Sequence, residues 1–244
     1  MSNKLALKIA QRIPIKPYLM KATEGMISFT FDDILHSAAT RGSEILLQRG
    51  FAGTYYVSGG LTDQIENGQQ CHSRSDLLAL AHAGHELGAH TFTHVSVPGL
   101  SRSAFFQQAE DSSAFIASID PGIRVSSFSY PFGDCDIKAK RWAAKRYACS
   151  RGVAQGLNQG WVDLAQLKAI PLQCGRIDEA GIRSAIDLAL QRKAWLIFYT
   201  HDISEHPSAF GCTPALLQYA VDYAHQVSAR VLPVKNALGA IAYR

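Results

Sequence analysis

The chain has 244 residues, of which 47% are hydrophobic and 18% are charged, and its formal net charge is +4 at pH 7. This composition is typical of a globular protein with a substantial apolar core, and it excludes an intrinsically disordered chain. The basic residues form no dense cluster, so we expect no nucleic-acid partner. The sequence contains no run of about 18 uncharged apolar residues, so we predict no transmembrane segment.

The N-terminal segment, residues 5–15, alternates aliphatic side chains with Lys8 and Arg12 and lacks the apolar region and cleavage site of a secretory signal. It is interpreted as a helix that packs on the body of the protein, with a weakly amphipathic helix on a membrane surface as the alternative. The odd number of cysteines and the absence of a CxxC pair predict reduced thiols. Together these features predict a cytoplasmic location. The cysteines are at positions 71, 135, 149, 174 and 212.

Strand-like and helix-like runs alternate along most of the chain. We expect strands at 26–31, 51–57, 86–90, 125–130, 147–152, 167–172, 195–200 and 230–234. We expect helices at 37–48, 76–83, 101–119, 136–146, 178–192 and 213–228. Such alternation predicts an α/β fold of parallel strands joined by right-handed crossovers, and seven or eight units suggest a barrel. With no internal repeat or linker, we expect a single domain over residues 1–244.

Two adjacent carboxylates follow the first of these strands. Residues 26–31 are apolar, aromatic or β-branched, and Asp32 and Asp33 come directly after them. Chemistry in parallel α/β folds is concentrated at the carboxyl ends of the strands. The pair is therefore a candidate functional site, although an Asp-Asp pair by itself is more often a solvated turn or a helix start.

Two histidines four residues apart, His90 and His94, follow the strand expected at 86–90. If the local backbone is a helical turn, this spacing puts both imidazoles on one face. Two histidines and one carboxylate commonly hold a divalent cation such as Zn²⁺ and leave a position for water, which the cation acidifies. The two segments together therefore outline a metal-dependent hydrolase.

These segments resemble, in order along the chain, the motifs of the polysaccharide deacetylases, a carbohydrate esterase family with a NodB-homology domain. The segment ending in Asp32 and Asp33 resembles the first motif, whose first aspartate is the catalytic base and whose second binds metal. The segment from His90 to His94 resembles the second, whose outer histidines complete the metal site. The resemblance implies one divalent cation, zinc foremost, with cobalt and nickel also suited to such a donor set.

Two later segments extend the resemblance. Residues 128–133 (FSYPFG) resemble the third motif, whose backbone helps to bind the oxyanion, which assigns this role to the neighbourhood of Tyr130. Residues 197–202 (IFYTHD) resemble the final motif and place His201 as the general acid. The resemblance covers about residues 24–235 and implies the distorted (β/α)₇ barrel of the family.

The chain departs from the family pattern at two places. Ser129 stands where many members carry an arginine that orients the catalytic aspartate. Arg151, on the next expected strand, either replaces that arginine or is an ordinary surface residue. The fourth motif, with its Asp and Trp, has no clear counterpart, since Trp161 and Asp163 lie in a Gly- and Asn-rich stretch that predicts a loop.

Other polar residues have structural interpretations. Ser73 and Asp76 have the spacing of a helix N-cap. His85 is expected to be structural because it begins the strand that leads to His90. Asp202 is expected to act as a cap or ion-pair partner more than as an orienting group for His201.

The resemblance and the residues together predict a metal-dependent N-deacetylase. Its expected substrate is an acetylated amino sugar or glycan, as an intermediate of bacterial surface polysaccharide or lipopolysaccharide biosynthesis. Two alternatives remain open: an amidohydrolase that acts on a small non-sugar amide, and a catalytically silent binding protein on the same fold. The sequence predicts no particular oligomeric state.

Overall fold

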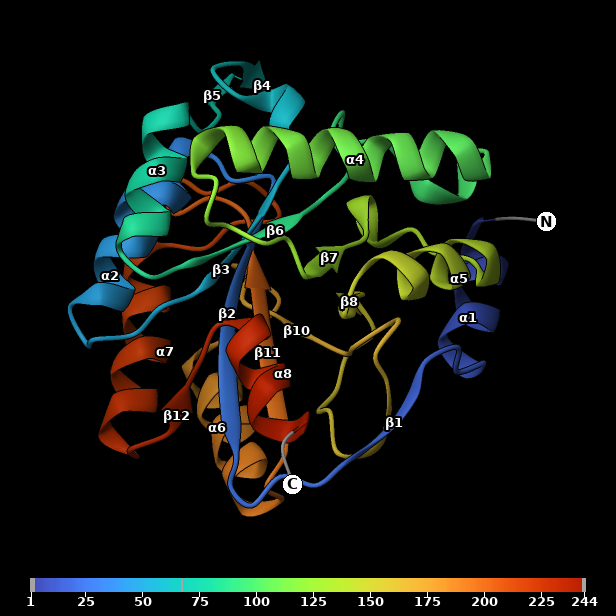
Figure 1. The fold of residues 1–244 in the computed structure, drawn as a ribbon. Helices are drawn as coiled ribbons and strands as arrows, with labels where there is room; N and C mark the ends of the chain where they lie inside the picture. Colours follow the sequence, from blue (N-terminus) through green and yellow to red (C-terminus); the bar gives the residue numbers. More distant parts are fainter. Residues whose placement is uncertain (1–2, 67, 243–244) are drawn as a thin grey trace.

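The computed structural model describes residues 3–66 and 68–242 (Figure 1). One sheet of eight parallel strands organises the molecule, in the order β10-β11-β2-β3-β6-β7-β8, with β12 paired to β2 outside this path. Each of these strands overlaps a strand expected from the sequence. Their bounds are β2 (Met26–Asp32), β3 (Thr54–Val57), β6 (Glu86–Ala89), β7 (Ser127–Ser129), β8 (Cys149–Arg151), β10 (Ile170–Pro171), β11 (Trp195–Thr200) and β12 (Arg230–Val231).

The sheet curves into a barrel that is not fully closed by paired strands. Within the described residues, β8 meets the segment before β10 through a single bridge between Arg151 and Leu167. Strand β2 is shared: its first residues pair with β12 and its last three with β3. The predicted distorted barrel is confirmed, and Arg151 of this closing bridge contacts Asp32 at the end of β2.

Helices surround the sheet (Figure 1). Helices α2, α3 and α7 lie on one side; α4 packs against β6, α5 packs against β8, and α1 packs against α5. Several helices begin at a side-chain cap, including the predicted one at Ser73, where Ser73 and Asp76 form a capping box. Helix α8 is absent from the sequence-based expectations. The bounds are α1 (Asn3–Arg12), α2 (Ser43–Leu47, after a π-helical turn at Ala38–Gly42), α3 (Arg74–His82), α4 (Arg102–Ile119), α5 (Ile137–Arg146), α6 (Glu179–Gln191), α7 (Pro214–Gln226) and α8 (Val234–Ala242).

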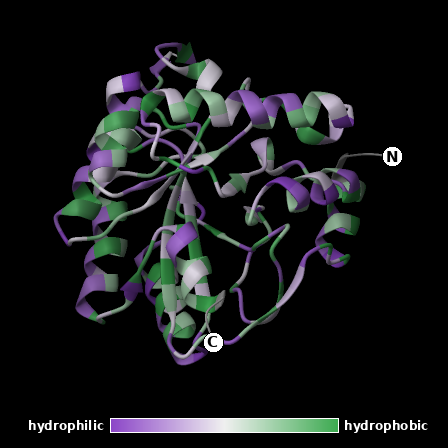
Figure 2. Ribbon diagram, in the orientation of Figure 1, coloured by the Kyte–Doolittle hydropathy of each residue, from purple (hydrophilic) through white to green (hydrophobic). Residues whose placement is uncertain are grey.

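The core lies between the sheet and these helices. Every residue of β2 is buried, as expected for a parallel strand covered on both faces. The surrounding helices carry both hydrophobic and hydrophilic residues, as helices with one buried side do (Figure 2). No helix in the described part of the chain combines the length and the apolar character that crossing a membrane requires.

The N-terminal helix packs against α5. Ala10 of α1 belongs to the same buried cluster as Ala139 and Ala143 of α5. The buried Lys140 donates from Nζ to the carbonyl oxygens of Ala10, at 2.6 Å, and Ile13, at 2.7 Å. The packed position of this helix, which the sequence analysis favoured, is therefore the observed one.

The expectation of a loop around Trp161 and Asp163 is wrong. Strand β9 (Gly160–Asp163) pairs in antiparallel fashion with β1 (Pro17–Met20). Its partner lies about 140 residues earlier in the chain, so local sequence holds no sign of the pairing. Asp163 forms an ion pair with Lys140 at 2.6 Å and accepts hydrogen bonds from the N–H groups of Ile15 and Lys16.

A buried carboxylate ties α8 to the amino-terminal ends of three strands. Glu86 accepts hydrogen bonds from Thr54 Oγ1 at 2.9 Å, Ser127 Oγ at 2.6 Å and the N–H of Lys235 at 2.8 Å. These residues begin β3 and β7 and the first turn of α8. A carboxylate at a helix N-terminus is favourably placed relative to the helix dipole.

Candidate active site

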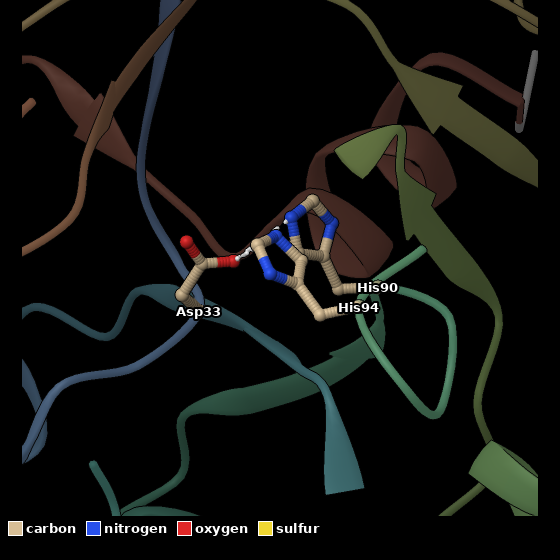
Figure 3. Close-up of side chains that lie close together, drawn as sticks. All are labelled: Asp33, His90 and His94. Atoms are coloured by element: carbon tan, nitrogen blue, oxygen red, sulfur yellow. Dashed lines mark ion pairs between the residues drawn. The ribbon is translucent and has the colours of Figure 1, made fainter. Parts of the chain in front are cut away.

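Asp33, His90 and His94 converge at the carboxyl ends of β2 and β6 (Figure 3). Asp33 Oδ1 lies 3.1 Å from His90 Nε2 and 2.9 Å from His94 Nε2. Asp33 has a positive φ of 60°, which turns its side chain away from the strand direction. The three residues predicted to hold the metal therefore form one compact group, with candidate ligand atoms all within 4.8 Å of one another.

The expected helical turn between the two histidines is not present. Thr91 and His94 both have a φ of 53°, in the left-handed region, and the segment is an irregular turn after β6. The side chains meet through this turn, and the sequence spacing fits either geometry. Positive φ at non-glycine residues is uncommon and is often found at functional sites.

The chemistry of this group fits a divalent cation. His90 Nδ1 lies 2.7 Å from the carbonyl oxygen of Ser129, which only accepts, so Nδ1 carries the proton. The lone pair of a neutral His90 then lies on Nε2, next to the carboxylate of Asp33. Within the described residues, Asp33 Oδ1 is buried without a hydrogen-bond donor. Lone pairs brought this close repel one another unless a cation lies between them.

The carboxylate of Asp33 is anionic. Burial alone would raise its pKa, but protons shared from the rings of His90 and His94 lower the pKa well below its ordinary value, and a bound cation would take the place of those protons. Together with the neutral imidazole of His90, this is the donor set of a two-histidine, one-carboxylate metal site.

Asp32 is held by Arg151. The Nη2 group of Arg151 donates to both carboxylate oxygens of Asp32 and to Ser129 Oγ. Ser129 and Arg151 are direct neighbours across β7 and β8, so the small serine leaves room for the guanidinium of the adjacent strand. Arg151 is buried, and the alternative of an ordinary surface residue is wrong.

The electrostatics of this pair keep Asp32 ionised. Burial would raise the pKa of Asp32, but the charge of Arg151, which is the largest opposing influence, lowers it below the ordinary value. The pKa of Arg151 is raised, because the attraction of Asp32 outweighs burial. Arg151 lies behind Asp32 and not on the cavity wall, so it contacts the carboxylate and not a ligand in the cavity.

His201 follows the end of β11 and faces the same group. Its Nε2 lies 3.8 Å from Asp33 Oδ2, and its Nδ1 is buried without a hydrogen-bond partner in the described part of the chain. Asp202 points elsewhere: it accepts hydrogen bonds from the N–H and hydroxyl of Ser208 and so organises the following loop. This is the capping role expected for Asp202.

Tyr130 does not reach the site, and its assignment needs correction. Its side chain is 1% exposed and its hydroxyl donates to the carbonyl oxygen of Ala165. Its N–H donates to the carbonyl oxygen of Arg151 at 3.3 Å. Phe132, two residues later, lies on the cavity wall, with a φ of 59° and its ring 4.6 Å from that of His94. The sequence signal for this unusual backbone position was present in Pro131-Phe132-Gly133, where a glycine follows the aromatic residue.

A cavity of about 500 Å³ encloses the site. Among the sequence-predicted residues it contains Asp32, Asp33, His90, His94 and His201. Trp161 lines a separate cavity, so the structure places no fourth-motif tryptophan in the site. Residues on the wall to which the sequence assigned no role include Glu66, Phe132, Gln173, Arg176 and Phe210.

The sequence of this chain matches a known family over residues 20–149, and that family is described as polysaccharide deacetylase. The chain belongs to the polysaccharide deacetylase family. A curated relative is a gellan lyase from Bacillus sp, 30% identical over 125 residues, which are 50% of this chain and 5% of the lyase. This deacetylase-family chain thus matches a small part of a much longer protein.

Solved structures share the fold of this family member. The Xyl-CE4 domain of a multidomain xylanase from the hindgut metagenome of Trinervitermes trinervoides has a TM-score of 0.64 and 16% identity, covering 91% of this chain and 93% of that one. A family 4 acetyl xylan esterase from Clostridium thermocellum, in complex with a cobalt ion, has a TM-score of 0.61 and 15% identity, covering 88% and 90%. A CE4 family pseudoenzyme from Bacillus anthracis has a TM-score of 0.61 and 14% identity, covering 93% and 69%. At these identities the likeness shows the fold, and the chemistry must be argued from the site.

Proposed function

We propose that this protein is a metal-dependent hydrolase that removes the acetyl group from the nitrogen of an acetylated amino sugar. The observation that carries the proposal is the convergence of candidate ligand atoms from Asp33, His90 and His94, with Asp32 and His201 in the same cavity. Family membership alone would not suffice, because a CE4 pseudoenzyme shares the fold.

Each residue has a distinct task in the proposed reaction. Asp33, His90 and His94 would hold the cation, which supplies Lewis acidity that acidifies a water and polarises the acyl group. Asp32, kept ionised by Arg151, accepts the proton of the attacking water. His201 gives a proton to the departing nitrogen, which is a very poor leaving group without one.

The Phe132 N–H is the proposed donor to the acyl oxygen. Among the described residues it has no backbone acceptor, whereas the Tyr130 N–H is already bonded within the sheet. A free backbone donor held at a cavity wall is the usual form of an oxyanion site. The positive φ of Phe132 is consistent with a backbone held in a special conformation for this purpose.

The proposed metal, biosynthetic setting and substrate class come from the sequence and the relatives. Zinc is the proposed cation, with cobalt and nickel suited to the same donor set. The proposed setting is assembly of bacterial surface polysaccharide or lipopolysaccharide inside the cell. Family relatives of known name act on carbohydrates, including a peptidoglycan N-acetylglucosamine deacetylase and an acetyl xylan esterase. The first of these favours an acetamido sugar over a non-sugar amide.

Metal analysis combined with acetate release tests the proposal. The purified protein should contain about one divalent cation per chain and release acetate from N-acetylglucosamine oligomers or nucleotide-linked sugars. Removal of the cation with a chelator should abolish release, and its return should restore it. His94→Ala should lose both cation and activity, because two ligands hold a cation poorly. Asp32→Asn should keep the cation and lose at least about 100-fold in turnover.

His82→Ala is the matched control, since His82 is an exposed residue in the last turn of α3, outside the cavity. It should behave as the unaltered protein. A protein that binds the cation but releases no acetate from any acetylated sugar would instead favour the silent binding protein. Full turnover in Asp32→Asn would contradict the proton-transfer role.

A further inference from the structure

Some of the charged side chains that line the cavity have no group beside them that neutralises their charge. Asp32 is neutralised by Arg151, and Asp33 would be neutralised by the cation that it is proposed to hold. Two charges remain, those of Glu66 and Arg176. The nearest basic atom to Glu66 is His94 Nδ1, at 3.9 Å. Arg176 is an exposed side chain on the cavity wall and, within the described part of the chain, forms no ion pair, so its charge is available to a ligand.

A second unpaired donor lies beside Arg176. Gln173 and Arg176 belong to the turn after β10, in which the N–H of Arg176 donates to the carbonyl oxygen of Gln173 at 3.0 Å. The Gln173 side chain is 3% exposed and lines the cavity, and its Nε2 has no partner among the described residues. A buried donor without an acceptor is unfavourable, and an acceptor on a ligand would satisfy it.

This turn lies on the His201 side of the cavity. Strand β10 pairs with β11 through Pro171 and Tyr199, and β11 ends one residue before His201. Because His201 is proposed to protonate the leaving nitrogen, the sugar that carries this nitrogen lies on the same side. The ring of Phe210, 58% exposed and 5.5 Å from the ring of His201, provides a flat apolar surface there. Glu66 lies beside His94.

We propose that Gln173 and Arg176 form a subsite for an anionic group, a phosphate or a carboxylate, attached to the amino sugar close to its acetamido group. A guanidinium binds such groups with two parallel hydrogen bonds, and the Gln173 amide adds a third donor. The inference rests on the proposed deacetylation, because that reaction places the sugar on the His201 side. It narrows the substrate class to anionic amino sugars.

Three substrates separate the possible anions. Acetate release is measured from N-acetylglucosamine 1-phosphate, from N-acetylmuramic acid and from the uncharged methyl glycoside of N-acetylglucosamine. We expect kcat/KM for one of the anionic sugars to exceed that for the glycoside by about tenfold or more, chiefly through a lower KM. The preferred anion identifies the subsite as one for phosphate or for carboxylate.

Variants of Arg176 test the residue itself. In Arg176→Gln the ratio of kcat/KM between anionic and neutral sugars should fall close to 1, and Arg176→Lys should retain part of it. Arg183→Gln is the matched control, because Arg183 is an exposed arginine of α6 outside the cavity. It should keep the original ratio.

A binding measurement gives a readout that needs no turnover. Calorimetry with metal-free protein should show N-acetylglucosamine 1-phosphate or N-acetylmuramic acid binding more tightly than the methyl glycoside. Added salt and Arg176→Gln should each weaken this binding, the substitution by about tenfold. Gln173→Leu should weaken it by a smaller factor.

The two proposals fail in different ways. Equal acetate release from anionic and neutral sugars, with no effect of Arg176→Gln, would overturn the anionic subsite and leave the deacetylase proposal intact. Absence of acetate release from every sugar, with Arg176-dependent binding preserved, would overturn the deacetylase proposal and leave the subsite intact.

Discussion

At the scale of single residues, the central feature is that Asp32, the proposed base, and Arg151, which binds its carboxylate, come from strands that are not neighbours. Asp32 ends β2, and Arg151 ends β8 across the barrel opening. The guanidinium bonds both carboxylate oxygens and Ser129 Oγ, so it restrains the orientation of Asp32 as well as its charge. From the strand next to Ser129, Arg151 thus makes the contact with Asp32 that the family resemblance assigns to an arginine at the Ser129 position.

Replacement of Arg151 should change the pH dependence of the reaction. In Arg151→Gln, burial still raises the pKa of Asp32 and the largest opposing charge is lost, so the pKa rises. The carboxylate must be ionised to accept a proton, so the acid limb of the kcat/KM profile should move to higher pH. Activity at neutral pH should fall by about tenfold or more. For Arg151→Lys, the pH of the acid limb and the activity at neutral pH should lie between those of Arg151→Gln and those of the original protein.

Profiles of kcat/KM from pH 4 to 9, with metal content measured on the same samples, check this prediction. The metal content should be unchanged, since Arg151 touches no ligand of the proposed cation. An acid limb at the same pH in Arg151→Gln would show that Arg151 does not control the ionisation of Asp32.

At the scale of secondary-structure elements, Lys140 connects three elements that are far apart in the sequence. Its side chain is buried in α5, donates to the carbonyl oxygens of Ala10 in α1 and of Ile13 just after it, and pairs with Asp163 of β9. Burial would raise the pKa of Asp163, but Lys140 and several backbone N–H groups lower it below the ordinary value. One ammonium group thus satisfies acceptors that would otherwise be buried without partners.

Lys140→Met should therefore destabilise the N-terminal region strongly. The methionine fills similar space but leaves Asp163 and two carbonyl oxygens without their cation, at a cost of about 3 kcal/mol in the free energy of unfolding. Urea denaturation followed by circular dichroism measures this quantity. The control, Lys145→Met, alters an exposed lysine of the same helix and should change the free energy by less than about 0.5 kcal/mol. Equal effects of the two variants would contradict the joining role of Lys140.

At the scale of the whole molecule, the protonation of His85 and the protonation of Glu86 change the stability of the fold in opposite directions. The N–H of Gly53 donates to His85 Nδ1 at 2.9 Å, so Nε2 carries the proton and donates to Ser43 Oγ. Burial lowers the pKa of His85 to about 4, which agrees with its expected structural role. For Glu86, burial raises the pKa, although hydrogen bonds from Ser127, Lys235 and Thr54 lower it in part.

Acid should destabilise the protein through His85. As the pH falls below about 6.5, the unfolded chain binds a proton at His85. The folded chain does not do so until about pH 4, so stability is lost across this window. The loss amounts to at most roughly 3 kcal/mol for a shift of this size. Glu86 acts oppositely, because the folded protein takes up its proton before the unfolded chain does.

Unfolding free energies between pH 7 and 4 check this prediction. His85→Asn keeps an acceptor for Gly53 but does not titrate, so its stability should depend less on pH than that of the original protein. His82→Asn, at an exposed histidine, should keep the original dependence. If the unfolding free energy of His85→Asn depends on pH as steeply as that of the original protein, His85 is not the group that causes the loss of stability in acid.

The sequence alone determined the parallel strands and the positions of Asp32, Asp33, His90, His94 and His201. Buried parallel strands are continuous apolar runs, and polar residues directly after them fall at one edge of the sheet, so both signals are local. The helices with clear caps were predictable for the same reason.

The tertiary structure alone decided the remaining features. These are the β1–β9 pairing, the docking of α8 through Glu86, the partner of Arg151, and the presence of Phe132 instead of Tyr130 on the cavity wall. The turn from His90 to His94 also belongs here, because an i, i+4 spacing fits either a helix or a left-handed turn. Each depends on contacts between segments distant in the chain or on a backbone conformation held by its surroundings, and neither leaves a periodic pattern in the local sequence.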